Sequence, residues 1–127
     1  MIFGLFGNRQ ARQARQLNRD APVIIEHAEQ LFTDNRLAEI AKTVVEHRKR
    51  AFEMFGRSAV DLHRAHDEYR KLHKEARRRN AQADLTAMTL VIIQIRSEIA
   101  GVDAAPARAA IDQFITRWGG AEDVAPS

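Results

Sequence analysis

The residues best suited to chemistry are five histidines in a chain without cysteine, three of them in the stretch DLHRAHDEYRKLH. His63 and Asp67 are four residues apart and His66 lies beside Asp67, so a helix would bring them near enough to share a metal ion. His73 lies two helical turns from His66, about 10 Å along the axis, which is too far for the same ion. No histidine follows a glutamate by three residues, the spacing of carboxylate-bridged di-iron bundles. We therefore expect the histidines to pack at a core edge and expect no metal and no cofactor.

The other polar residues form no motif that is typical of nucleophilic or acid–base catalysis. The three serines correspond to a helix cap, a helix surface position and the chain end: Ser58, Ser97 and Ser127. None lies in a G-x-S-x-G turn, and the glycine-rich phosphate-binding motifs do not occur. Adjacent carboxylates such as Asp67 and Glu68 point apart on a helix. The sequence therefore predicts a protein that is not an enzyme.

The strongest charge feature is a basic block over residues 42–79, with twelve lysines and arginines against six acidic residues. A polyanion could use as phosphate contacts the cations that avoid the apolar stripe, namely Lys49, Arg50, Arg57, Arg64, Lys71, Lys74 and Arg78. The block lacks interleaved aromatic residues for base stacking. Pairs such as Glu46 and Arg50 have the spacing of ordinary solvated helix pairs. Nucleic-acid binding is therefore the alternative interpretation and a solvated face is the preferred one.

The opening stretch MIFGLFGNRQARQARQLNRD places apolar residues before a row of arginines. Drawn as a helix, it puts Phe3, Phe6, Gly7, Gln10, Ala14 and Leu17 on one stripe and the arginines on the other side. This separation is typical of a segment that lies in a membrane interface. The docking residues on this interpretation are Ile2, Phe3, Leu5, Phe6, Arg9, Arg12, Arg15 and Arg19. An equally good interpretation buries the four apolar side chains in the protein's own groove.

Helices are expected to position all these groups, because the chain is rich in Ala, Arg, Gln, Glu and Leu and holds only three prolines and six glycines. A length of 127 residues suits one domain. We predict an all-α fold, either a helical bundle or a long helical hairpin of three to five helices with an amphipathic N-terminal segment. The predicted divisions are a basic segment over 1–19, a helical domain over 20–118 and a disordered tail over 119–127.

The first helices after the N-terminal segment are predicted from caps and apolar spacing. Asp20 followed by Pro22 indicates a helix start, with a short helix over about 21–33. From residue 37 onward, apolar residues recur in alternating steps of four and three that continue past Gly56, which favours one helix over 36–79. The nearly equal alternative is two helices of about 20 residues, with Gly56 as a C-cap and Ser58 opening a capping box.

The next helix is predicted to start at Asn80 or Asp84 and to run to Ile99, with Gly101 as its C-cap. It is apolar on two faces, so it lies either at the centre of the fold or between two chains. The second option predicts a homo-oligomer with an interface at Leu90 and Ile93. Asp103 is expected to cap the last helix, which ends near Trp118.

Together these features predict a non-enzymatic helical interaction or adaptor protein. Its N-terminal segment is expected to dock on an anionic membrane surface or in a protein partner. No apolar run is long enough for a bilayer span, and the opening lacks the order and cleavage site of a secretory signal. A cytoplasmic location, peripheral at the membrane, follows from this interpretation. The alternative function is a basic helical nucleic-acid-binding protein that uses residues 49–79.

Overall fold

The computed structural model describes the backbone of residues 2–119 and the side chains of residue 9 and residues 11–119. Over this range the chain is helical and contains no strand. A 3-10 turn, η1 (Gly101–Ala104), joins the last two of five helices: α1 (Ile2–Leu31), α2 (Asp34–Met54), α3 (Ala59–Arg78), α4 (Gln82–Ala100) and α5 (Ala105–Trp118). The predicted all-α class with three to five helices is confirmed. The side chains of Ile2, Phe3, Leu5 and Phe6 lie outside the described residues, whereas Ala14 and Leu17 of the same apolar stripe are buried.

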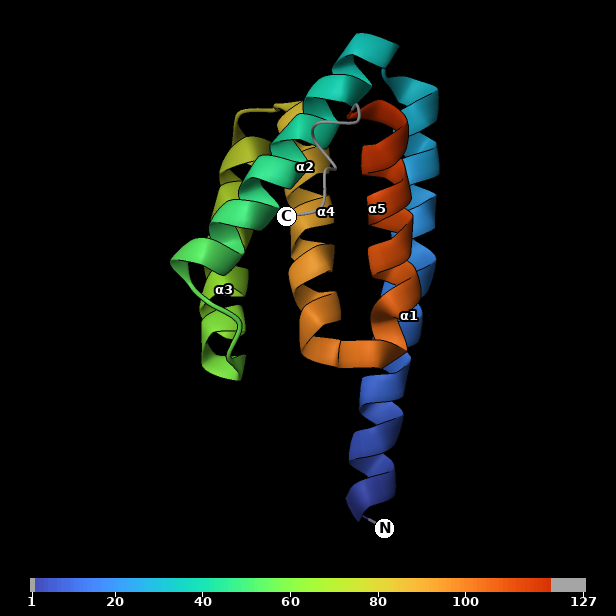
Figure 1. Cartoon of the computed structure of the whole chain (residues 1–127), viewed down its shortest axis with the longest axis vertical. Coiled ribbons are helices and arrows are strands. Elements are labelled where there is room, and N and C mark those ends of the chain that lie inside the picture. Colours follow the sequence, from blue (N-terminus) through green and yellow to red (C-terminus); the bar gives the residue numbers. More distant parts are fainter. Residues whose placement is uncertain (1, 120–127) are drawn as a thin grey trace.

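The helices form an up-and-down bundle in which α3, α4 and α5 alternate in direction and α2 crosses obliquely (Figure 1). Helix α4 contacts each of the other four helices, whereas α3 packs chiefly on α4. We call the end of the bundle that carries the α2–α3 turn and η1 the basal end. The distal end carries the α1–α2 and α3–α4 turns (Figure 1).

Burial of α4 on several sides explains its two apolar faces within one chain. Leu90 is fully buried and Ile93 is 5% exposed. Neither side chain is therefore available as a surface for a second copy, and the reason for placing an oligomer interface there disappears. The oligomeric state itself stays a prediction.

One segment of the described chain, Gln82–Trp118, is long and apolar enough by composition to cross a membrane. It does not form one helix, because η1 turns the chain so that α4 and α5 run in opposite directions (Figure 1). Its apolar residues fill the core of the bundle, including Leu90, Val91, Ile95, Ile111 and Phe114.

The predicted helix start at Asp20 is wrong, because α1 continues through Pro22 and crosses the predicted boundary at residue 19 without a break. Proline removes one helical hydrogen bond, which costs about 3 kcal/mol in a helix interior. Burial outweighs this local cost, since Leu17 and Ala21 precede Pro22 in the core and Ile25 follows it. The Asp20 carboxylate accepts a hydrogen bond from Gln16 Nε2 at 3.0 Å and so supports the helix from within.

The favoured single helix over 36–79 is also wrong, and the alternative of two helices is correct. The chain turns at Gly56, whose φ of +95° is costly for any residue with a side chain. Ser58 Oγ caps α3 by accepting a hydrogen bond from the Asp61 backbone N–H at 3.1 Å. Only four residues, 55–58, separate α2 from α3. Because four residues are close to one helical turn, the apolar register continues across the break.

Two side chains hold the turn between α4 and α5, where Gly101 ends α4 as predicted with a φ of +73°. Asn18 of α1 accepts a hydrogen bond from the Ala107 backbone N–H at 3.0 Å and donates one to the Asp103 carbonyl at 2.9 Å. Arg108 Nη1 donates to the carbonyls at the end of α4, including that of Ser97 at 2.7 Å. The predicted cap by Asp103 is therefore wrong, because a side chain from another helix caps α5.

Candidate functional site

The first turns of α1 extend beyond the rest of the bundle at the basal end (Figure 1). Among the described side chains of α1, burial begins at Ala14, which is 1% exposed. Asn18, one turn further on, ties the helix to η1. The backbone from Ile2 to Ala14 spans roughly 18 Å at 1.5 Å per residue. Helix α1 is thus anchored in the bundle by its later turns and presents its earlier turns to the surroundings.

A row of exposed arginines follows the outer side of this helix, at Arg9, Arg12, Arg15 and Arg19. The buried residues Ala14 and Leu17 lie between them in sequence and on the opposite helical face. Arg19 Nη2 donates to Gln16 Oε1 at 3.0 Å, and within the described part of the chain none of the four arginines forms an ion pair. The other predicted docking residues, Ile2, Phe3, Leu5 and Phe6, have side chains outside the described residues.

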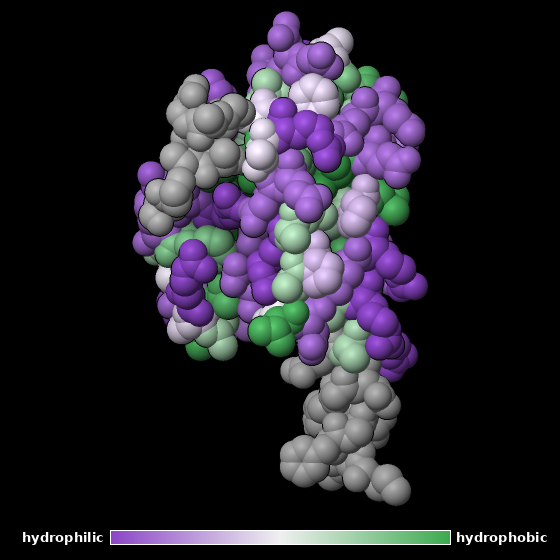
Figure 2. All heavy atoms as spheres, turned by 45° about the vertical axis from the view of Figure 1, so that its right-hand side comes forward, coloured by the Kyte–Doolittle hydropathy of each residue, from purple (hydrophilic) through white to green (hydrophobic). Residues whose placement is uncertain are grey.

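The basal end also carries exposed apolar residues that were not predicted from the sequence as binding residues. Val102 is 85% exposed in η1 and Ile99 is 40% exposed just before it. Met54 and Val60, on either side of the α2–α3 turn, are 71% and 61% exposed. Figure 2 shows apolar side chains at the lower edge of the bundle, close to where α1 emerges. The only sequence signal for these residues is that each lies within a few positions of Gly56 or Gly101.

The seven cations predicted as a polyanion surface are all exposed, but they do not form one continuous row. Lys49 and Arg50 belong to α2, and Arg57 lies in the turn, where its guanidinium sits 4.1 Å above the Phe52 ring. The remaining four recur at steps of seven, three and four residues on the solvent side of α3: Arg64, Lys71, Lys74 and Arg78. Glu75 forms an ion pair with the last of these, which reduces its availability to a polyanion.

His47 and His66 are half-buried and take part in helix packing, whereas His27 and His63 are exposed. His47 Nδ1 lies 3.0 Å from the buried Tyr69 hydroxyl, which donates to the His47 carbonyl at 3.1 Å. Burial lowers the pKa of His47 and also that of His66, where the positive charge of Arg96 adds to the effect. Within residues 9–119 no three His, Asp or Glu side chains converge as metal ligands, so His63, His66 and Asp67 are not gathered into such a group.

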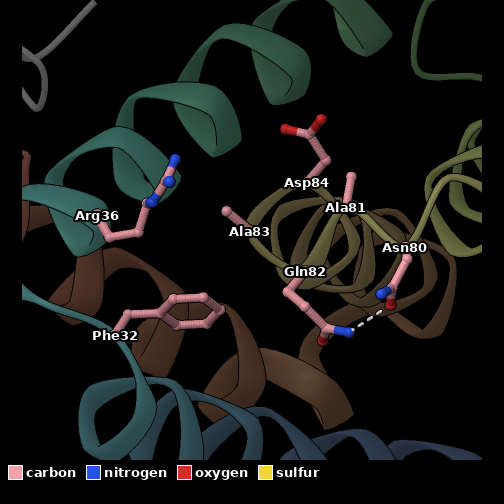
Figure 3. A pocket seen from close by; sticks show the side chains of 7 residues that line it. All are labelled: Phe32, Arg36, Asn80, Ala81, Gln82, Ala83 and Asp84. Carbon is pink, nitrogen blue, oxygen red and sulfur yellow. Dashed lines mark hydrogen bonds between the residues drawn. The ribbon is translucent and has the colours of Figure 1, made fainter.

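A cleft of about 330 Å³ opens at the distal end between the start of α2 and the start of α4. Phe32 and Arg36 face the first residues of α4 across it, and Gln82 Nε2 donates to Asn80 Oδ1 at 2.9 Å (Figure 3). Its polar side chains are all exposed. Arg36 also pairs with Glu39 at 3.2 Å. The cleft therefore lacks the buried, convergent polar groups that fix a small ligand.

Exposed apolar residues and a row of arginines coincide at the basal end, which makes this end the best candidate for a binding surface. Its geometry fits adsorption to an extended surface better than capture of a small molecule, since the groups point outward from turns and a projecting helix. No protein-family model matches the chain, and no curated protein and no solved structure matches it significantly.

Proposed function

We propose that this protein is a non-enzymatic helical module that docks reversibly on an anionic membrane surface through the first turns of α1. The observation that carries the proposal is the projection of α1 beyond the bundle with exposed arginines along it. In a cell, such a module is a cytoplasmic protein that associates peripherally with the bilayer.

Anchoring of the later turns of α1 favours docking by the earlier ones. An isolated segment with Gly4 and Gly7 would have to nucleate a helix on the membrane, and nucleation is the costly step. Here the helix is already nucleated, because Ala14, Leu17, Ala21 and Ala28 are buried in the bundle. The docking segment therefore extends an existing helix, which lowers the entropy lost on binding.

The expected free energies favour weak and reversible binding. Burying Ile2, Phe3, Leu5 and Phe6 would contribute roughly 1.5–3 kcal/mol each. Each arginine near an anionic surface adds about 1 kcal/mol. Ordering the segment and removing it from water offset much of this sum. The apolar residues are expected to dominate retention and the arginines to select anionic lipid.

A vesicle co-sedimentation experiment tests the proposal. Wild-type protein is expected to sediment with phosphatidylserine-containing vesicles and to bind phosphatidylcholine vesicles far more weakly. The Phe3→Ser, Phe6→Ser variant should lose most of this binding. A matched control, Val23→Ser with Leu31→Ser, removes two exposed apolar residues from the same helix and should bind like wild type.

Three outcomes would contradict membrane docking by α1. The wild type could fail to bind, or both double variants could bind equally well. Alternatively, the Phe3→Ser, Phe6→Ser variant could unfold, as followed by circular dichroism, which would assign these residues to the core. Docking in a protein groove would be the remaining interpretation if vesicles fail while the fold stays intact.

Nucleic-acid binding is a second candidate, because all seven cations predicted for it are exposed. It is less well supported, since they are spread over two helices and a turn and one is paired with Glu75. Salt dependence separates the two functions. Binding through phosphate contacts falls steeply with salt, whereas retention through apolar side chains largely survives it.

A further inference from the structure

We infer that the α2–α3 turn is a second membrane contact, which together with α1 orients the basal end toward the same anionic bilayer. The contact consists of Met54, Arg57 and Val60, here called the turn patch. The inference rests on the proposed function, because it assumes the membrane that α1 binds. It adds a contact that is separate from α1 in the sequence.

The apolar side chains of the turn patch are exposed to solvent and do not contribute to the core of the bundle. Met54 is 71% and Val60 61% exposed, at the last residue of α2 and the second residue of α3. The described chain has six large exposed apolar residues, and four of them lie in η1 or within two residues of η1 or of the α2–α3 turn: Met54, Val60, Ile99 and Val102. Their concentration around these two turns distinguishes them from the single exposed apolar residues that any surface carries.

The charge around the turn patch fits anionic lipid. Residues 49–64 hold four lysines and arginines against two carboxylates. Arg57 lies between the two apolar residues and stacks over the Phe52 ring, so its charge stays beside them. Apolar side chains next to cations are the combination that binds the headgroup region of an anionic bilayer.

The turn is held in one conformation before any contact is made. Gly56 adopts a φ of +95°, Ser58 caps α3, and the Phe55 and Gly56 N–H groups donate to carbonyls at the end of α2. A prearranged turn loses little entropy on binding.

The two contacts lie at one end of the molecule but on different helices. In Figure 1 the start of α1 projects below the bundle, and the α2–α3 turn lies higher, on the opposite side of the bundle's lower half. Once α1 is bound, contact by the turn patch is intramolecular and needs only modest affinity. A single anchor would leave the bundle free to rotate about α1, whereas two anchors fix its orientation.

Fluorescent labelling tests the contact directly, because the chain has no cysteine of its own. Met54→Cys carries an environment-sensitive fluorophore such as nitrobenzoxadiazole, and Val23→Cys, 63% exposed on α1, is the control. With phosphatidylserine-containing vesicles, the label at position 54 is expected to shift to the blue and brighten, while the label at position 23 changes little. Equal responses at both positions, or none at position 54, would overturn the inference.

Binding measurements separate this inference from the proposed function. Met54→Ser with Val60→Ser is expected to lower affinity for these vesicles about five- to tenfold, and Val23→Ser with Leu31→Ser should not change it. If the Phe3→Ser, Phe6→Ser variant loses binding but the turn variant matches the control, the turn patch is refuted and docking by α1 stands. If only the turn variant loses binding, docking by α1 fails and the two-contact orientation is refuted, with the turn patch left as the single membrane contact.

Discussion

The two ends of the bundle differ in what their charged side chains contact. At the distal end, four arginines have acidic partners: Arg36 pairs with Glu39, Arg78 and Arg79 lie near Glu75, and Arg117 pairs with Glu29. At the basal end, Arg9, Arg12, Arg15 and Arg57 form no ion pair within the described part of the chain.

On the proposed function, the position of the docking surface does not follow the highest positive charge. The most cationic stretch, at the end of α3, lies at the distal end, where carboxylates neutralise part of it. At the basal end, Arg57 lies between the exposed Met54 and Val60 in the sequence, and Arg9, Arg12 and Arg15 form no ion pair among the described residues. Availability of the charge, together with neighbouring apolar surface, indicates a docking site more directly than charge count does.

Replacing arginines at the two ends should give the largest difference in binding. The triple change of Arg9, Arg12 and Arg15 to Gln is expected to weaken binding to phosphatidylserine-containing vesicles by up to roughly a hundredfold, since each arginine contributes about 1 kcal/mol. The matched change of Arg36, Arg78 and Arg79 to Gln removes the same charge from the distal end and should have little effect. Equal losses in co-sedimentation would mean that net charge alone drives binding and would remove the distinction between the ends.

Asn18 should have the next largest effect, because it joins α1 to the turn at the basal end. Asn18→Ala leaves the Ala107 N–H and the Asp103 carbonyl without their partner, and we expect a loss of about 2 kcal/mol in the free energy of unfolding. Asn18→Asp keeps the acceptor for Ala107 and should lose less. Urea denaturation followed by circular dichroism measures both changes, and an unaltered Asn18→Ala variant would show that α1 is held by packing alone.

The same residue shows where sequence reasoning reaches its limit. Composition and helical spacing correctly indicated the all-α class, the Gly101 cap and a helix that is apolar on two faces. The contacts of Asn18 join residues 85 and 89 positions apart, so no local pattern records them. Pro22 misled the prediction because burial of its neighbours outweighs a local preference, and the four-residue turn at Gly56 preserved a register that a turn usually interrupts.

The candidate site was predictable only in part, for a similar reason. Periodicity placed the arginine row opposite the buried stripe of α1, since both follow from one helix. The exposure of Met54 and Val102 depends on where the turns fall relative to the whole bundle. Phe55 and Met54 both lie close to Gly56, yet Phe55 is half-buried and Met54 is exposed, so nearness to a glycine does not predict exposure.

Glu29 provides a smaller test, at the distal end. Burial raises the pKa of this carboxyl, but hydrogen bonds from Trp118 and Arg117 outweigh it and lower the pKa below its usual value. A lowered pKa means that the folded state favours the carboxylate. Ionised Glu29 therefore stabilises the fold above about pH 4.5, and this contribution is lost as the pH falls through the pKa of Glu29 in the folded state. Glu29→Gln should cost roughly 0.5–1 kcal/mol at neutral pH and weaken the acid dependence. Vesicle binding by Glu29→Gln should match that of the wild type. A change would show that the distal end affects binding at the basal end.

His66 should have the smallest effect on the stability of the fold, and this effect should lie in a higher pH range than that of Glu29. Burial lowers its pKa, and the positive charges of Arg96 and Arg70 lower it further. The folded state therefore favours the neutral imidazole, so its contribution is complete above the ordinary value of 6.5 and declines as the pH falls from there toward the folded pKa. Thermal unfolding at pH 7.5 and pH 5 should show lower stability at pH 5, with part of the difference removed in His66→Gln.

The exposed neighbour His63 supplies a comparison for this last experiment. His63→Gln changes the same residue type on the same helix and should narrow the difference between pH 7.5 and pH 5 by less than His66→Gln does, because charge on His63 is the smallest of the causes that shift the pKa of His66. The lowered pKa of His47 leaves a residual pH dependence in the His66→Gln variant, because burial beside Tyr69 acts in the same direction. If His66→Gln retains the whole difference, the imidazole is more solvated than its place against α4 implies, and His47 becomes the main source. Vesicle binding compared at the same two pH values should follow the folded fraction alone, because neither histidine belongs to the basal surface.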